Sequence, residues 1–186
     1  DAMGARGRVA MRLTKRIPMG AGLGGGSSDA AAVLLALPAL AGRRPSMNVL
    51  LQAASELGSD VPFFLLGGTA LGIGRGTELA PLPDAPARPG LLIAPGLHID
   101  TRQAYAALSG RLTTESQQNK IVSFQSQTWG LSAGEPPAND FERVAFEQHG
   151  CLASLKRKLL RAGASVAMMT GSGSALFGLF FAREEA

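Results

Sequence analysis

A chain of 186 residues that is 46% apolar is long enough for one domain, or two small ones, with a packed core. Its net charge of +4 leaves an anionic small substrate, a nucleic acid or no charged partner open. Scattered basic residues and an aromatic content of 5% argue against nucleic-acid binding. The one cysteine, Cys151, fits a reducing compartment and is expected to be buried. No apolar run is long enough to span a bilayer, so we expect a cytoplasmic protein with no membrane partner.

Residues 8–13 alternate between apolar and other side chains, which predicts a half-buried strand that ends before Pro18. The chain does not begin with methionine and opens in what this pattern predicts to be an interior strand. We therefore expect the sequence to be a piece of a longer protein.

The most informative stretch is residues 18–31, where five glycines fall within seven residues and an alanine-rich run follows. Glycine accepts left-handed backbone, so such a loop can turn several N–H groups toward one point. The helix predicted next, over residues 30–37, adds its N-terminus, and Ser27, Ser28 and Asp29 are favourable N-cap types. This combination predicts a phosphate site rather than a flexible linker. The candidate phosphate-binding residues are Pro18, Gly20, Gly22, Leu23, Gly24, Gly25, Gly26, Ser27 and Ser28.

Two familiar phosphate-binding patterns fit this stretch poorly. The P-loop requires a lysine where Gly26 stands. The glycines of the dinucleotide fingerprint match at Gly20, Gly22 and Gly25, but that fingerprint also requires a buried strand before the loop and a later carboxylate. The preceding segment is polar and ends in Pro18, so a dinucleotide oxidoreductase is disfavoured.

A second helix is predicted from Ser46, its N-cap, to Leu57, with Gly58 as the C′ residue. Asp60 comes next, two residues before Pro62. Spacing alone favours the interpretation of Asp60 as the N-cap of a helix over a catalytic role. Residues 69–82 are strand-like, and their glycines indicate strand curvature more than a further phosphate site.

Four prolines between Pro81 and Gly90 mark the best candidate for a domain boundary. We therefore predict domains over residues 1–85 and 86–186. The second of these opens with a short buried strand, residues 91–94.

A helix predicted from Thr101, or from the residue before it, carries Tyr105, which spacing alone makes a half-buried core residue. The lone His98 is expected to be structural or exposed rather than catalytic. Residues 110–138 are rich in Gln, Ser and Thr and predict a variable loop that Trp129 anchors.

Asn139 and Glu142 have the spacing of a capping box at the start of another helix. The helix predicted over residues 152–162 carries a basic run that is most simply a solvated face. Two short strands then flank a second glycine loop, residues 170–174. Its uniformly small residues indicate close approach to a ligand or to the first glycine loop, more than a plain hairpin turn.

The string from Lys15 to Ala31 resembles the ATP-binding signature of the GHMP small-molecule kinases. Residues 58–64, 139–142 and 170–175 also match, in the family's order and with roughly its spacing. The resemblance covers most of the chain and implies an α+β, two-domain fold. Its N-terminal domain, here incomplete, would be like domain 2 of ribosomal protein S5, and its C-terminal domain would be ferredoxin-like.

Within the family, the motifs are most similar to those of kinases that phosphorylate the 2-hydroxyl of diphosphocytidyl methylerythritol. The resemblance implies that ATP donates the phosphoryl group and that Mg²⁺ binds together with ATP. It also implies that the first glycine loop binds the ATP phosphates and that Asp60 is the catalytic residue. It also implies that a second set of residues faces the substrate, with Tyr105 stacked on the cytosine. These residues are Thr101, Tyr105, Gly171, Ser172 and Gly173.

Two alternatives stay open beside this function: another GHMP kinase with a mevalonate-type or sugar substrate, and a non-catalytic nucleotide-binding fragment. The resemblance implies an N-terminal segment whose lysine partners the aspartate, and Lys15 is not that lysine. We expect the isolated chain to be weakly active or inactive, and its oligomeric state is open.

Overall fold

The computed structural model describes residues 8–109 and 138–181. The chain forms two compact units. The first unit takes in the chain up to Met19 and from Gly24 to Ala87, and the second takes in Gly20–Leu23 and the chain from Arg88 onward. The glycine-rich stretch is therefore divided between the two units.

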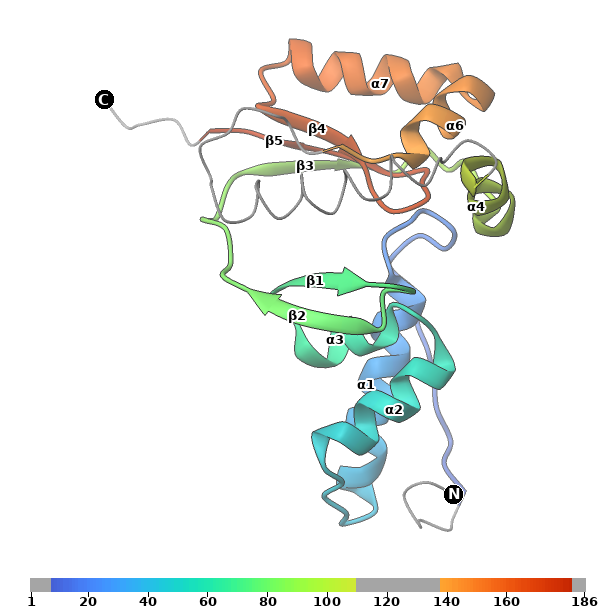
Figure 1. Ribbon diagram of the computed structural model, residues 1–186, viewed down its shortest axis with the longest axis vertical. Helices are drawn as coiled ribbons and strands as arrows, with labels where there is room; N and C mark the ends of the chain where they lie inside the picture. Colours follow the sequence, from blue (N-terminus) through green and yellow to red (C-terminus); the bar gives the residue numbers. More distant parts are fainter. Residues whose placement is uncertain (1–7, 110–137, 182–186) are drawn as a thin grey trace. The chain divides into compact units, whose positions relative to one another are not determined.

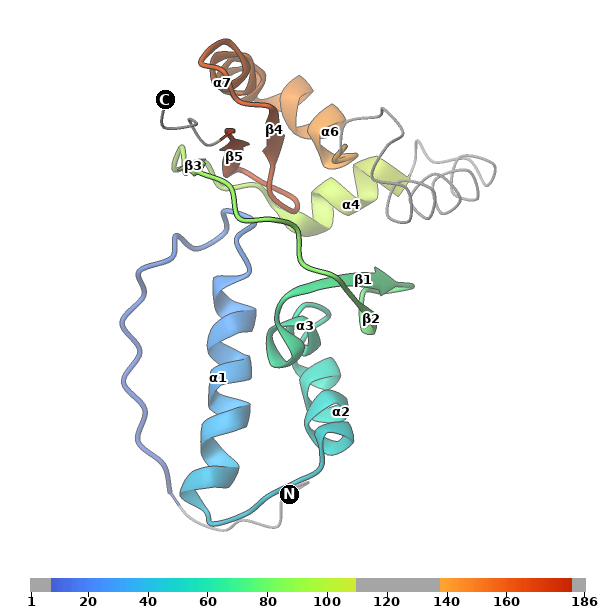
Figure 2. The ribbon, with the colours of Figure 1, turned by 90° about the vertical axis from the view of Figure 1, so that its left-hand side faces the viewer.

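The first unit contains three helices and a two-stranded hairpin (Figures 1 and 2). Its elements are α1 (Gly25–Leu40), α2 (Met47–Leu57), α3 (Val61–Leu66), β1 (Thr69–Ile73) and β2 (Glu78–Leu82). The three helices pack on one another around a small core of Ala31, Leu34, Ala54 and Val61. β1 and β2 pair antiparallel, and Gly74 and Gly76 lie between them with φ of 62° and 85°. The strand-like segment is thus a hairpin whose glycines serve a tight turn.

α1 begins at Gly25, so the prediction that it starts at Ala30 was wrong. Gly24 is the N-cap with φ 64°, and residues 27–29, predicted as caps, lie inside the first turns of the helix. Ile17 covers Gly25 in the first turn of α1, and its Cγ2 would lie 2.9 Å from a Cβ at that position. Only glycine fits there, and the packing outweighs the low helix propensity of glycine.

Ser46 precedes α2 and Asp60 precedes α3, and both occupy the N-cap positions predicted for them. Gly58 directly follows α2, as predicted, with an extended backbone at φ 168°. Its backbone N–H donates to the carbonyl of Ala54 at 3.1 Å and ends the helix without a left-handed turn.

Residues 8–13 are extended but are not part of a sheet, so the predicted half-buried strand was wrong. Val9, Met11 and Leu13 are 53%, 67% and 64% exposed. Figure 2 shows the segment running apart from α1. The alternation was read correctly as extended backbone, but none of the described strands lies beside it to pair with it.

The second unit is a three-stranded antiparallel sheet with helices packed against it (Figure 1). The strand order is β3 (Gly90–Ile93), β5 (Leu176–Leu179), β4 (Val166–Met169). Among the residues that the structure describes, the helices of this unit are α4 (Thr101–Ser109), α6 (Phe141–Gln148) and α7 (Gly150–Arg161). α7 packs on β4 and β5, and α6 lies between α7 and α4.

The core of the second unit lies between α7 and the sheet, where Leu152, Leu159, Met169 and Leu176 are buried. Cys151 is exposed, so the expectation of a buried cysteine was wrong. Its neighbour Leu152 takes the inward-facing position of the helix instead. The predicted loop over residues 110–138, with its Trp129 anchor, lies outside the described residues except for its last residue.

Candidate functional site

Within the part of the chain that the structure describes, the N-terminus of α1 has no side-chain cap. The first bond of the helical ladder runs from the Ser28 N–H to the Gly24 carbonyl at 2.9 Å. The N–H groups of Gly25, Gly26 and Ser27 precede it and therefore have no acceptor within the helix. Gly26 is exposed, and a Cβ there would meet nothing within 4 Å, so the space beside this residue is open. This helix end can receive an anion.

Lys15 lies beside this helix end. Its ammonium group pairs with the Asp29 carboxylate and would lie 3.4 Å from a Cβ at Gly25. Sequence reasoning did not assign Lys15 to the site. The signal that could have found it is its place in the polar segment directly before the glycine loop.

Asp60 stands at the start of α3, and its carboxylate makes no capping hydrogen bond. The interpretation of Asp60 as a purely structural N-cap therefore lacks the bond on which it depends. Phe64, one turn further along α3, packs against Gly24. The exposed Asp60 thus belongs to a helix that is anchored at the N-cap of α1.

In the second unit, the two glycine loops are in direct contact. The buried Ala21 accepts hydrogen bonds through its carbonyl from the Ala175 N–H at 3.0 Å and from the Thr170 Oγ1 at 3.3 Å. Gly22 has φ 74°, and a Cβ there would collide with the carbonyl of Thr170. The predicted close approach of the second loop to the first is confirmed, and it explains why Gly22 has no side chain.

The second glycine loop is also tied to the start of α4. The hydroxyls of Thr101 and Ser172 lie 3.0 Å apart, so two of the predicted substrate-facing residues are in contact. The buried Ser174 donates through Oγ to the carbonyl of Leu97 at 2.5 Å. His98 lies against Gly20, where its ring fills the space that a side chain would need.

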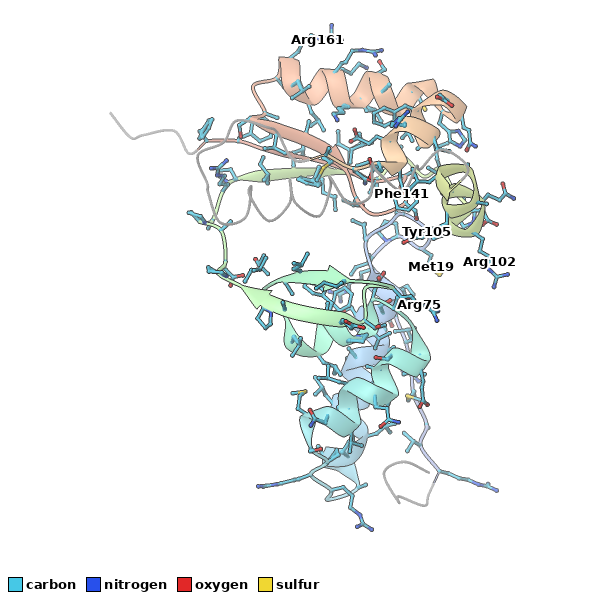
Figure 3. The ribbon with its side chains drawn as sticks, in the orientation of Figure 1. Met19, Arg75, Arg102, Tyr105, Phe141 and Arg161 are labelled. Carbon is cyan, nitrogen blue, oxygen red and sulfur yellow. The ribbon has the colours of Figure 1, made fainter. Side chains whose placement is uncertain are left out.

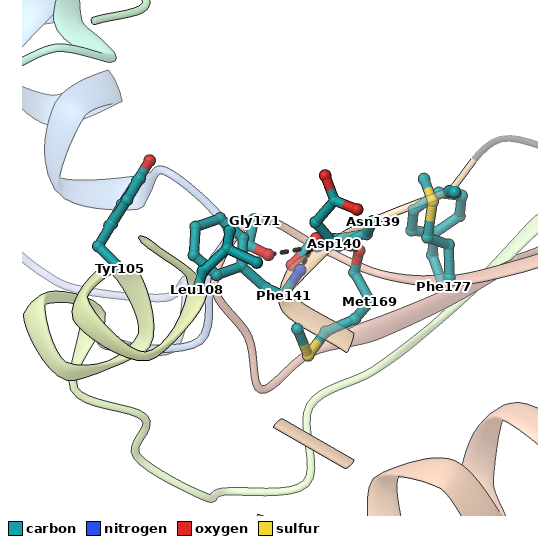
Figure 4. Close-up of a pocket in the computed structure, with 11 residues that line it drawn as sticks. Tyr105, Leu108, Asn139, Asp140, Phe141, Met169, Gly171 and Phe177 are labelled. Atoms are coloured by element: carbon teal, nitrogen blue, oxygen red, sulfur yellow. Dashed lines mark hydrogen bonds between the residues drawn. The ribbon is translucent and has the colours of Figure 1, made fainter. Parts of the chain in front are cut away.

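A pocket of about 460 Å³ opens beside this loop (Figure 4). Its walls come from α4, the start of α6, β5, and the end of β4 with the loop that follows. They include Tyr105, Leu108, Asn139, Asp140, Phe141, Met169, Thr170, Gly171 and Phe177. The lining combines aromatic rings with a carboxylate, an amide and a hydroxyl, as small-molecule sites usually do.

Tyr105 is 57% exposed, so its interpretation as a half-buried core residue was wrong. Its ring meets that of Phe141 edge to face, with 4.8 Å between the centroids. Both rings are labelled in Figure 3, on α4 and on α6. Tyr105 is thus an exposed aromatic residue in the lining of the pocket.

Asn139 and Glu142 do not form the predicted capping box. The Oδ1 of Asn139 accepts from the Phe141 N–H at 3.0 Å, as an N-terminal cap does. The carboxylate of Glu142, however, turns away to the Met169 N–H and the ammonium group of Lys156. Lys156 is therefore paired, and the interpretation of its basic run as a wholly solvated face was wrong for this residue.

Each unit thus contains one part of the predicted site. The first unit holds Pro18, Asp60 and Gly24–Ser28, and the second holds Gly20–Leu23 with the predicted substrate-facing residues. Within residues 8–109 and 138–181, no three His, Cys, Asp or Glu side chains gather as a metal site. In the same ranges, no helix combines the length and apolar character needed to cross a membrane.

Comparison with known proteins agrees with this arrangement. Residues 1–68 match the GHMP kinases N terminal domain, and residues 120–186 match the GHMP kinases C terminal domain. The chain belongs to the GHMP kinase family, and its mixed helix and strand architecture is the fold that the sequence predicted.

Two relatives of the chain carry the same name. The chain is 67% identical over 184 residues to the 4-diphosphocytidyl-2-C-methyl-D-erythritol kinase of Solibacter usitatus, covering 97% of this chain and 58% of the relative. It is 40% identical to the kinase of that name from Geobacter metallireducens, covering 96% of this chain and 62% of the relative. A crystal structure of 4-(cytidine 5'-diphospho)-2C-methyl-D-erythritol kinase superposes with a TM-score of 0.66 at 40% identity. That match covers 89% of this chain and 59% of the crystallised chain.

Proposed function

We propose that the protein containing this chain transfers the γ-phosphoryl group of ATP to the 2-hydroxyl of 4-diphosphocytidyl-2-C-methyl-D-erythritol. The observation that carries this proposal is the uncapped N-terminus of α1, directly after a glycine loop, in a chain 67% identical to a kinase of that name. The chain spans 58% and 62% of the length of two such relatives, so the activity is proposed for a protein of the relatives' length.

The N–H groups of Gly25, Gly26 and Ser27 would bind the ATP phosphates, because they lack acceptors within α1 and Gly26 borders open space. Phosphoryl transfer depends mainly on positioning and on stabilising charge. The glycine loop fits this demand because its backbone can approach the phosphates without a side chain between them.

Asp60 would orient the substrate hydroxyl and accept its proton as the new oxygen–phosphorus bond forms and ADP leaves. Its carboxylate suits that role because it is exposed and makes no capping bond.

Mg²⁺ in such sites is held by substrate phosphates and only one or two protein groups, and it would neutralise charge on the phosphates. The half-buried Ser27 and Ser28 lie in the first turns of α1, and their hydroxyl oxygens could bind such an ion.

The substrate would bind in the second unit, with the cytosine on the exposed ring of Tyr105 and the polar groups near Thr101 and Gly171–Gly173. The substrate identity is supported by the shared name of the relatives. A mevalonate-type or sugar substrate is the alternative within the family. We place the protein in the cytoplasm, where small-molecule kinases meet ATP.

The test uses the protein at the full length of its relatives, with Asp60→Asn and, as a matched control, Asp84→Asn. Asp84 is another exposed aspartate of the first unit, and it accepts a hydrogen bond from Thr69. Phosphate transfer from labelled ATP is measured with diphosphocytidyl methylerythritol, a mevalonate-type alcohol and a sugar.

We expect product only with the first alcohol, a loss in kcat of about 10²–10⁴-fold for Asp60→Asn, and little change for Asp84→Asn. ATP binding should survive in both variants. Turnover of another alcohol alone would overturn the substrate, and failure of the wild type to bind ATP would overturn the whole proposal.

A further inference from the structure

Met169, the last residue of β4, is held through both of its backbone polar groups by side chains from the start of α6. Its N–H donates to Glu142 Oε1 at 2.8 Å, and its carbonyl accepts from Asn139 Nδ2 at 2.9 Å. The same Nδ2 donates to the carbonyl of Gly171 at 2.7 Å (Figure 4). Because carbonyls only accept, the amide orientation of Asn139 is fixed by these two bonds.

Glu142 is 8% exposed, which is unusual for a carboxylate. Its second oxygen, Oε2, lies 2.5 Å from the Nζ of Lys156 in α7. A buried carboxylate needs such a partner, because an unpaired buried charge is strongly destabilising. Lys156 therefore holds the Glu142 carboxylate in the position from which it binds the Met169 N–H.

The segment that begins at Met169 is the one that supports the first glycine loop. Thr170 donates its hydroxyl hydrogen to Ala21, and a Cβ on Gly171 would lie 3.2 Å from the carbonyl of Gly22. Asn139 and Glu142 thus bind Met169, directly before the second glycine loop, and Asn139 also binds Gly171 within it. This is the loop that contacts Ala21 and Gly22. All of these contacts lie within the second unit.

We propose that Asn139, Glu142 and Lys156 are positioning residues that fix the second glycine loop, and through it Gly20–Leu23, in the conformation that binds nucleotide. This inference rests on the proposed function. The three side chains act through Met169 and Gly171 and touch no reacting atom. Capping the helix would require only the Oδ1 of Asn139. It would not account for the two bonds that Nδ2 donates to Met169 and Gly171, or for the ion pair between Glu142 and Lys156.

Three variants separate this role from general stability, all in the protein at its relatives' full length. Asn139→Asp keeps the oxygen that caps Phe141 but replaces the donor to Met169 and Gly171. Glu142→Gln keeps an acceptor for the Met169 N–H but loses the charge. Lys156→Met removes the partner of Glu142, and Lys158→Met is its matched control, because Lys158 is exposed on the same helix.

The first readout is hydrogen exchange at the Ala175 N–H, which bonds to Ala21 across the two loops. We expect at least tenfold faster exchange in Asn139→Asp and Lys156→Met, a smaller change in Glu142→Gln, and none in Lys158→Met. The second readout is the dissociation constant of ATP, which should rise about tenfold while kcat at saturating ATP changes less.

A fall in Tm with unchanged exchange at Ala175 and unchanged ATP affinity would overturn the inference, since the cluster would then only stabilise the fold. If the wild type binds no ATP, the proposed function fails, and the exchange measurement alone decides whether the cluster fixes the loop.

Discussion

The ring of Phe64 in α3 fills the space beside Gly24, where a Cβ would lie 2.6 Å from the ring Cζ. Gly24 is the N-cap of α1, so this contact ties the start of α1 to the helix that Asp60 precedes. Both the left-handed φ of 64° and the ring demand glycine at this position.

Gly24→Ala should therefore destabilise the protein, by about 1–3 kcal/mol in the free energy of unfolding. Denaturant titration measures the loss. In the background of Phe64→Leu, part of the penalty should disappear, because the steric share of it is gone. A full penalty in both backgrounds would mean that the backbone angle alone requires glycine.

Gly26→Ala should behave in the opposite way. Gly26 lies inside α1 with nothing within 4 Å of a Cβ, so alanine should stabilise the helix by about 0.5–1 kcal/mol. The added methyl group would occupy the open space proposed for phosphate, and ATP affinity should fall. Thermal unfolding and calorimetric titration measure the two effects, and unchanged ATP affinity would count against a phosphate site here.

Cys151 should react with a thiol reagent in the native protein, because it is exposed at the start of α7. The native rate should approach that of the unfolded chain. Cys151→Ser should change the free energy of unfolding by less than about 0.5 kcal/mol. Protection of the native thiol would instead support the burial that the sequence predicted.

Tyr105→Ala should raise the KM for the diphosphocytidyl substrate, and Tyr105→Phe should raise it much less, because the ring that would stack on the base is retained. The edge-to-face pair with Phe141 should add about 0.5–1.5 kcal/mol to stability, and only Tyr105→Ala should lose it. Equal effects of the two variants on KM would indicate that the hydroxyl matters and the ring does not.

The sequence predicted the elements whose signals are local. Ser46 before α2, the strands around the second glycine loop and the helix of Leu152 and Leu159 follow from caps and periodicity. The approach of the two glycine loops was also predicted, because every residue from 170 to 174 has a small side chain or none, whereas a turn alone needs only one or two glycines.

What the sequence could not predict depends on partners far along the chain. Gly25 lies in the first turn of α1 with Ile17 packed against it, and the Glu142 carboxylate bonds to Lys156 and Met169 instead of forming a cap. The alternation of residues 8–13 indicates an extended backbone but not whether a neighbouring strand is there to pair with it. Each error is one of tertiary context outweighing a local preference.

The assignment of Gly20–Leu23 to the second unit has a consequence for protein engineering. The backbone crosses between the units at Met19–Gly20, at Leu23–Gly24 and at Ala87–Arg88. A single cut before Arg88 would not yield an autonomous C-terminal module, because it would leave the Ala175 N–H without Ala21 as its acceptor. A chimera between relatives that exchanges the second unit must therefore exchange the tetrapeptide as well, as a graft of two discontinuous pieces.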